Sequence, residues 1–281
     1  MFYILYWLLG AGWLLRTQAH LLTTTLLTES PGWVLNVYFV LVTTYLVLHG
    51  LEPMARMFLL FVPLYAAPFL FVVLAGMSDA DIGRLLPLLE DGVLPVLRGT
   101  WLAFVQGFGL SVLWMVLPHL RRRERALRAA LVGIAFVALP ASAANVVMLS
   151  MMGPREIAGL MYPTLLAFQL VELPGFTGFR LDPVFLMAWI AMAFSTVSLL
   201  QYAASTALSR LLRRPTAAGT TWVTGLVAAV LGALPVGQVE LVQWGQTVKP
   251  IVVTVAALGL PGVLLVCAEL RGRTGAGRRA S

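Results

Sequence analysis

Runs of uncharged apolar residues, each about as long as a membrane-spanning helix, follow one another along most of the chain, with short polar segments between them. A helix rises about 1.5 Å per residue, so about 20 residues cross a hydrocarbon core of about 30 Å. The runs lack the period-two alternation of a barrel strand, and backbone inside a bilayer must satisfy its own hydrogen bonds, so we expect helices. The pattern predicts eight spans, at residues 1–25, 33–51, 55–76, 99–120, 127–152, 183–209, 220–236 and 248–269.

Composition agrees with an all-α integral membrane protein. Of the 281 residues, 60% are hydrophobic and 11% are charged, and the mean hydropathy is +0.90. The gaps between the spans leave no room for a water-soluble domain, so we expect one polytopic membrane domain over residues 1–270 and a basic, disordered cytoplasmic tail over 271–281. The first 15 residues carry no basic segment, which argues against a cleaved secretory signal.

The net charge of +7 would fit a nucleic-acid partner, but the placement of the basic residues points to membrane topology instead. Thirteen of the 19 basic residues lie on one face if eight spans alternate, and we expect that face to be cytoplasmic, with both termini inside. Nine of the twelve acids lie in the opposite loops. The thirteen are Arg56, Arg121, Arg122, Arg123, Arg125, Arg128, Arg210, Arg213, Arg214, Arg271, Arg273, Arg278 and Arg279. We therefore expect no nucleic-acid partner.

Two long loops lie on the outer side in this topology. Residues 78–99 are predicted to form two short interfacial helices, and the apolar piece from Leu160 to Val171 is too short to span and is predicted to be a re-entrant or interfacial helix. Asp79 and Asp81 would fit a metal-binding carboxylate pair of a membrane glycosyltransferase. Acids two positions apart on a helix point in different directions, however, so we favour solvated loop acids and no enzyme activity.

The span from Trp101 to Leu120 contains the sequence Gln106-Gly107-Phe108-Gly109, where an inert anchor would carry Leu or Val. One interpretation is close packing, because small residues let a neighbouring helix approach. The other is a discontinuous helix whose freed amides and carbonyls bind a solute near the membrane midplane, with Gln106 adding a donor and an acceptor.

Other polar residues within the spans have simpler interpretations. Arg16 lies in the first span, where a central charge costs about 2.5 to 3.5 kcal/mol, so it either extends to the outer boundary or faces the bundle and pairs there. Glu52 and Arg56 are four residues apart and predict a local ion pair. Cys267, the single cysteine, is predicted to be a buried, small apolar residue. The three histidines are scattered among helix ends, so we expect no metal and no cofactor.

Five stretches occur in an order that resembles the B subunit of GerA-type spore germinant receptors, the spore germination permease family. They are LEPMAR, LLPLLEDGVLPVLRG, VLPHL followed by a basic loop, MGPREIAGLMYPTLLAFQLVE and FRLDPVFLMAWIAMAFSTVSLLQYAAS. The resemblance covers nearly the whole chain in one register. It implies similarity to the amino acid, polyamine and organocation transporter superfamily, with ten helices in two inverted five-helix repeats.

Two departures from the family pattern affect what the resemblance implies. The chain resembles the family's third to tenth helices, so the partner of the span from Trp101 to Leu120 is absent, and the sequence is either truncated or a reduced homologue. Family members also often carry an acid near Ser111 and a Lys near Thr196, and neither charge is present here. Both departures weaken an assignment of ion-coupled amino acid transport.

The resemblance implies a receptor subunit that recognises a small nutrient such as an amino acid in the spore inner membrane and signals to A-type and C-type subunits. The alternatives are a plain secondary transporter and a structural subunit without a ligand pocket. The candidate ligand-binding residues are Gln106, Gly107, Phe108, Gly109, Ser111 and Thr196.

Overall fold

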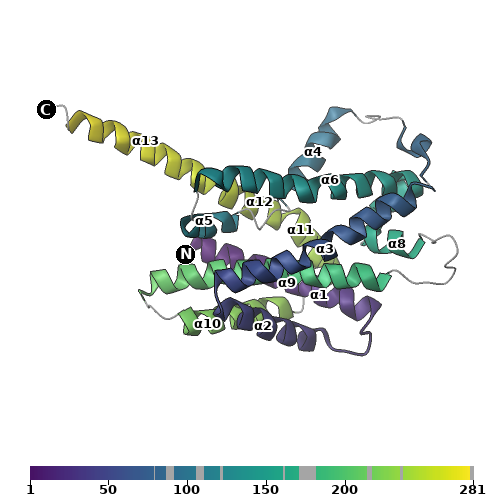
Figure 1. Cartoon of the computed structure of the whole chain (residues 1–281), viewed down its shortest axis with the longest axis horizontal. Helices are drawn as coiled ribbons and strands as arrows, with labels where there is room; N and C mark the ends of the chain where they lie inside the picture. The colour runs from purple at the N-terminus through teal and green to yellow at the C-terminus, as the bar shows by residue number, and fades with distance from the viewer. Residues whose placement is uncertain are drawn as a thin grey trace. The chain divides into compact units, whose positions relative to one another are not determined.

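The computed structural model describes residues 1–78, 80–86, 92–105, 111–120, 123–160, 162–170, 182–213, 217–234 and 237–278, and every regular element in these ranges is helical (Figure 1). The elements are α1 (Phe2–Thr25), α2 (Gly32–Leu48), α3 (Leu51–Gly76), η1 (Ile82–Leu85), α4 (Val93–Val105), α5 (Leu113–Val116), η3 (Leu117–His119), η4 (Arg123–Arg125), α6 (Ala126–Met152), α7 (Pro154–Ala158), α8 (Pro163–Leu170), α9 (Asp182–Leu211), α10 (Ala217–Ala233), α11 (Gln238–Gln246), α12 (Val248–Thr254), the π-helix η5 (Val255–Gly259) and α13 (Leu260–Arg278).

Long helices occupy most of the predicted spans. The spans at 1–25, 33–51, 55–76, 127–152, 183–209 and 220–236 correspond to α1, α2, α3, α6, α9 and α10, with ends shifted by a few residues. The span at 248–269 corresponds to α12, η5 and α13. Since α13 continues to Arg278, helical backbone extends into the predicted tail, and the domain boundary at residue 270 stays a prediction.

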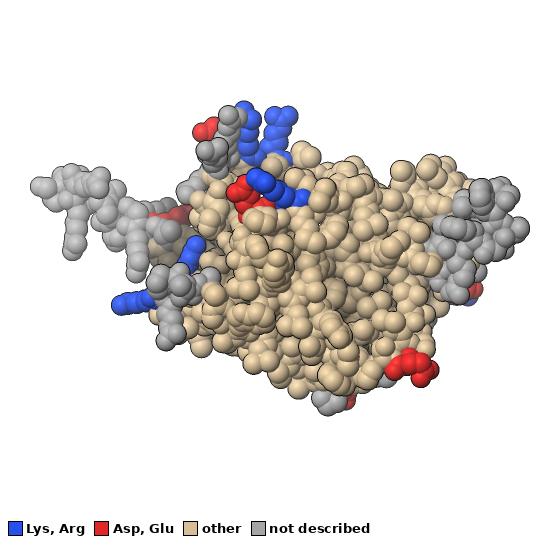
Figure 2. Space-filling view, turned by 60° about the horizontal axis from the view of Figure 1, so that its bottom comes forward, with Lys and Arg blue, Asp and Glu red and all other residues tan. Residues whose placement is uncertain are grey.

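Four helical stretches in the described part of the chain are long and apolar enough to cross a membrane. They are Leu51–Gly76, Ala126–Met152, Pro183–Leu211 and Val242–Cys267. Shorter apolar helices occur at Gly32–Leu48, Val93–Val105 and Ala218–Ala233. Figure 2 shows that charged residues are scarce on one face, where most of the surface in view belongs to residues other than Lys, Arg, Asp and Glu. The exact number of spans and the inverted repeat stay predictions.

The chain forms two compact units, each assembled from separate segments. Unit 1 comprises Met1–Leu48, Leu94–Pro118 and Thr196–Ser281, and unit 2 comprises His49–Val93 and His119–Ser195. In unit 1, α1, α2 and α10 pack against one another. In unit 2, α3 packs along α6, and Phe71 of α3 stacks on Phe168 of α8 with ring centroids 5.6 Å apart.

Glycines let α10 approach its neighbours in unit 1. A Cβ at Gly225 would lie 2.6 Å from Thr44 Oγ1 and 2.8 Å from Gln201 Nε2, and one at Gly232 would lie 2.9 Å from Leu15 Cβ. Buried side chains connect the helices at these places: Gln201 donates to Thr44 Oγ1 at 2.7 Å, and Asn36 donates to Gly232 O at 2.9 Å. Small residues and buried amides therefore hold this bundle together.

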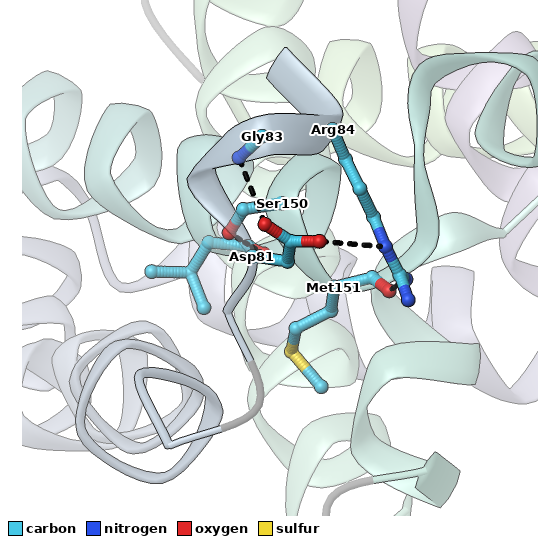
Figure 3. A network of polar contacts seen from close by, with 6 residues as sticks. Asp81, Gly83, Arg84, Ser150 and Met151 are labelled. Carbon is cyan, nitrogen blue, oxygen red and sulfur yellow. Dashed lines mark hydrogen bonds and ion pairs between the residues drawn. The ribbon is translucent and has the colours of Figure 1, made fainter. Parts of the chain in front are cut away.

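The segment after α3 is anchored to the end of α6 in unit 2 (Figure 3). The Asp81 amide donates to Ser150 O at 3.2 Å, and the Asp81 carboxylate accepts from Gly83 N at 2.9 Å. Arg84 lies 3.8 Å from the same carboxylate and donates to the Met151 carbonyl. Asp81 therefore caps η1 and pairs with Arg84, which gives it a structural role, while Asp79 lies outside the described residues.

Three further predictions can be compared with the structure. Arg56 and Glu52 form the predicted ion pair, with Nη2 and Oε1 2.6 Å apart. The segment after Met152 contains α7 and α8, and α8 is too short to span a membrane, as expected; its place on the outer side stays a prediction. The prediction for Cys267 is wrong, because this residue is exposed on α13. Exposure depends on which side of the helix has neighbours, and the apolar run did not reveal that side.

Replacing Gly225 with Ala is expected to lower the free energy of unfolding by about 1–3 kcal/mol, because the new methyl group would displace the Gln201–Thr44 hydrogen bond. Gly219→Ala on the same helix is the matched control, since a Cβ there would meet no atom within 4 Å. Tryptophan-fluorescence melting of the detergent-solubilised proteins measures the difference. Equal stabilities for both variants would contradict the close-approach role of Gly225.

Candidate functional site

The predicted helix interruption falls mainly on residues that the structure leaves undescribed. Gln106, Gly107, Phe108 and Gly109 lie outside the described ranges, while α4 ends at Val105 and α5 begins at Leu113. The predicted span at 99–120 therefore corresponds to α4, which begins earlier at Val93, and to the short elements α5 and η3. A ligand-binding interruption at Gln106–Gly109 stays a prediction.

Ser111 is the candidate residue whose surroundings are best defined. It is 3% exposed and accepts a hydrogen bond from Trp7 Nε1 at 2.9 Å. Its side chain also interacts with Tyr6, one residue before Trp7 on α1. Trp7 itself is 1% exposed, so this hydrogen bond lies within an apolar core. It fixes the start of α5 against the first turns of α1.

A π-helix, which is an irregular helical segment, lies near the same end of α1. The π-helix η5 precedes Pro261, whose ring has no N–H and would clash with the carbonyl four residues earlier in a regular α-helix. A wider turn avoids that clash, and such turns often occur at functional sites. The Tyr3 hydroxyl donates to Ala256 O within η5 at 2.8 Å, so α1 supplies a partner to the altered backbone.

These residues border an apolar hollow that we call the Tyr3–Trp7 groove. It encloses about 360 Å³ and is lined by Tyr3, Trp7, Met115, Pro261, Leu264 and Leu265. A second hollow of about 540 Å³ shares Tyr3, Met115 and Leu264 and extends to Arg210. The described lining of the Tyr3–Trp7 groove is therefore uncharged, whereas the neighbouring second hollow includes the cationic side chain of Arg210.

Thr196 and Arg16, the other polar candidates that the structure describes, have different surroundings. Thr196 is half-buried on α9, and the next residue, Val197, belongs to the same core cluster as Trp7 and Val112. The structure thus places Ser111 and Thr196 beside one core, and a ligand role for either stays a prediction. Arg16 is half-buried on α1 and lines a separate groove with Trp13 and Trp244.

Sequence reasoning missed Tyr3, Trp7 and η5, because the first and last spans were treated as plain membrane helices. Two features of the sequence pointed to them. The aromatic residues Phe2, Tyr3, Tyr6 and Trp7 are concentrated at the start of the first span, and Gly259 and Pro261 interrupt the last one. Aromatic side chains with a polar atom need a partner when buried, and a proline inside a helix frees a carbonyl.

Comparison with known proteins assigns the chain to a family. A family model described as "Spore germination protein" matches residues 1–235. The chain is 25% identical to spore germination protein YndE of Bacillus subtilis (strain 168) over 276 residues, which cover 96% of this chain and 74% of the relative. No solved structure matches the chain significantly.

Two further relatives from the same strain are similar over shorter regions. Spore germination protein A2 is 24% identical over 205 residues, covering 73% of this chain and 56% of the relative. Spore germination protein KB is 27% identical over 235 residues, covering 82% of this chain and 62% of the relative. With its apolar helices and a family match over most of its length, this chain is a membrane protein of the spore germination permease family.

Proposed function

We propose that the chain is the membrane subunit of a spore germinant receptor that recognises a small nutrient, such as an amino acid, and signals germination to A-type and C-type subunits. The observation that carries the proposal is the Tyr3–Trp7 groove in a chain of the spore germination permease family. Trp7 of this groove is bonded to Ser111, which follows the predicted interruption in the sequence. Relatives named spore germination proteins A2 and KB support a germination role.

The chemistry of the groove fits a small, partly apolar solute. Its volume of about 360 Å³ falls within the usual range for small-molecule sites, and its lining of aromatic and aliphatic side chains suits an apolar substituent. The buried hydrogen bond from Trp7 to Ser111 fixes the Trp7 ring that lines the groove. An interruption at Gln106–Gly109 would add free backbone amides and carbonyls for the carboxylate and ammonium groups of an amino acid.

A sensor is favoured over the alternative, a secondary transporter. Ion-coupled transport usually relies on charged groups within the membrane, whereas Ser111 and Thr196 are uncharged at the positions where the family often carries an acid and a lysine. A structural subunit that binds no ligand is the remaining alternative. On all three interpretations the chain is not an enzyme. We place it in the spore inner membrane, with both termini in the cytoplasm.

Spores carrying Trp7→Phe are expected to need at least roughly tenfold more nutrient for half-maximal germination, because the variant keeps an aromatic ring but removes the donor to Ser111. A panel of the twenty amino acids identifies the nutrient in wild-type spores, and the active one is then titrated. Trp222→Phe is the matched control, since Trp222 is 50% exposed on α10. An unchanged response of Trp7→Phe spores at normal protein abundance would rule out this site.

The topology is tested by cysteine labelling in a Cys267→Ser background. An impermeant maleimide applied to intact cells should modify Glu90→Cys and leave Arg123→Cys unmodified, because the arginine bias places Arg123 inside. Both variants should react after the membrane is permeabilised. The opposite pattern in intact cells would reverse the orientation.

Proteoliposomes containing this polypeptide alone are expected to take up no labelled amino acid under an imposed proton or sodium gradient. The expected result follows from the absence of charged side chains at Ser111 and Thr196. The empty liposome is the baseline, and an amino acid permease reconstituted in parallel is the positive control. Gradient-dependent uptake above the baseline would support the transporter alternative.

A further inference from the structure

The groove beside Arg16 differs in charge from the Tyr3–Trp7 groove. It encloses about 130 Å³, and its described lining residues come from α1, from α10 and the residue after it, and from α11: Leu9, Gly12, Trp13, Arg16, Leu231, Leu234 and Trp244. The residues from α1 are spaced at three and four positions, so they form one face of that helix. This lining combines an aliphatic floor with a cation and two tryptophans, and it contains no acid.

A second cation, from α12, lies against Trp13, one of the residues that line this groove. Lys249 Nζ lies 4.1 Å from the centroid of the Trp13 ring, and Lys249 is 6% exposed. A cation over the face of a tryptophan ring is attracted by the electron density of the ring, and the attraction grows when water is excluded. Arg16 and Lys249 therefore both adjoin Trp13 although they are more than 200 positions apart in the sequence.

The helices are arranged so that this place stays open to the surroundings. Gly12 allows α10 to approach, because a Cβ there would lie 2.6 Å from Leu231 Cβ, and the Trp13 ring lies close to α11 at Gly245, where a Cβ would make an ordinary contact of 3.7 Å with Cζ2. Trp244 is 50% exposed and Leu234 is 45% exposed. The groove thus has a half-buried cationic side at Arg16 and an exposed apolar and aromatic side.

We propose that this groove binds the headgroup of an anionic phospholipid. Arg16 lines the groove and Lys249 lies against its Trp13 ring, so two positive charges close to the described lining fit a phosphate group, and the leucines in that lining fit the first methylene groups of an acyl chain. Tryptophans commonly mark the headgroup level of a membrane, and basic pockets between membrane helices bind anionic headgroups. A free anion would gain nothing from the leucines, whereas a lipid uses both parts of the groove.

Lipid titration of the purified, delipidated chain in detergent tests the proposal. Native mass spectrometry is expected to show at least tenfold stronger binding of dioleoyl phosphatidylglycerol than of dioleoyl phosphatidylcholine, which has the same acyl chains and no net charge. The double variant Arg16→Gln/Lys249→Gln should lose this preference, and Arg16→Lys/Lys249→Arg should keep most of it. The matched control Arg56→Gln/Arg155→Gln removes two exposed arginines, and it should behave as the wild type.

A second measurement locates the lipid without changing any charge. Phosphatidylglycerol with brominated acyl chains should quench tryptophan fluorescence more than brominated phosphatidylcholine, and Trp244→Phe should reduce that difference. The proposal would be overturned if the wild type bound both lipids equally, or if the preference persisted in Arg16→Gln/Lys249→Gln. Displacement of the lipid by millimolar inorganic phosphate would also overturn it. Absence of any effect of Trp244→Phe on the quenching difference would do the same.

Discussion

Polar groups inside a bilayer must find partners within the protein, and in this molecule the packing of unit 1 depends on that constraint. Gln201 donates both to Thr44 and to the Thr221 carbonyl, and Asn36 donates to the Gly232 carbonyl. In water such amides would contribute little, because solvent competes for them. Between membrane helices, where water is scarce, they favour one rotation and one register of α2, α9 and α10 over others. Glycines at the same contacts bring the backbones close enough for these bonds to form.

The same constraint explains why irregular backbone occurs next to α1. Tyr3 supplies a donor to a backbone carbonyl of the π-helix, and Trp7 supplies one to the side-chain hydroxyl of Ser111, two residues before α5. Irregular backbone at membrane depth is tolerated where protein side chains or a cavity satisfy it, and here both are present. Two aromatic residues one helical turn apart thus stabilise the segments from which a solute site would be built.

The two grooves of unit 1 favour different ligands because their charges differ. The Tyr3–Trp7 groove is uncharged at its core and suits a small, largely apolar solute. The Arg16 groove pairs a guanidinium and an ammonium group with indole rings and suits an anion that also carries an apolar chain. Both grooves involve α1, at positions about two turns apart. A change in the position of α1 would therefore affect both grooves.

Much of the helical framework followed from the sequence by itself, because the bilayer sets the length and composition of a membrane helix whatever its neighbours are. The run lengths predicted the main helices, the order of short motifs indicated the family, and the four-residue spacing of Glu52 and Arg56 predicted their ion pair. The tertiary structure decided which faces meet. The contacts of Trp7 with Ser111 and of Lys249 with Trp13 join residues more than 100 positions apart, and the exposure of Cys267 depends on the neighbours of α13. Hydrophobic helices show little difference between their faces in sequence, so the rotation of each helix is set by packing, and packing creates the grooves.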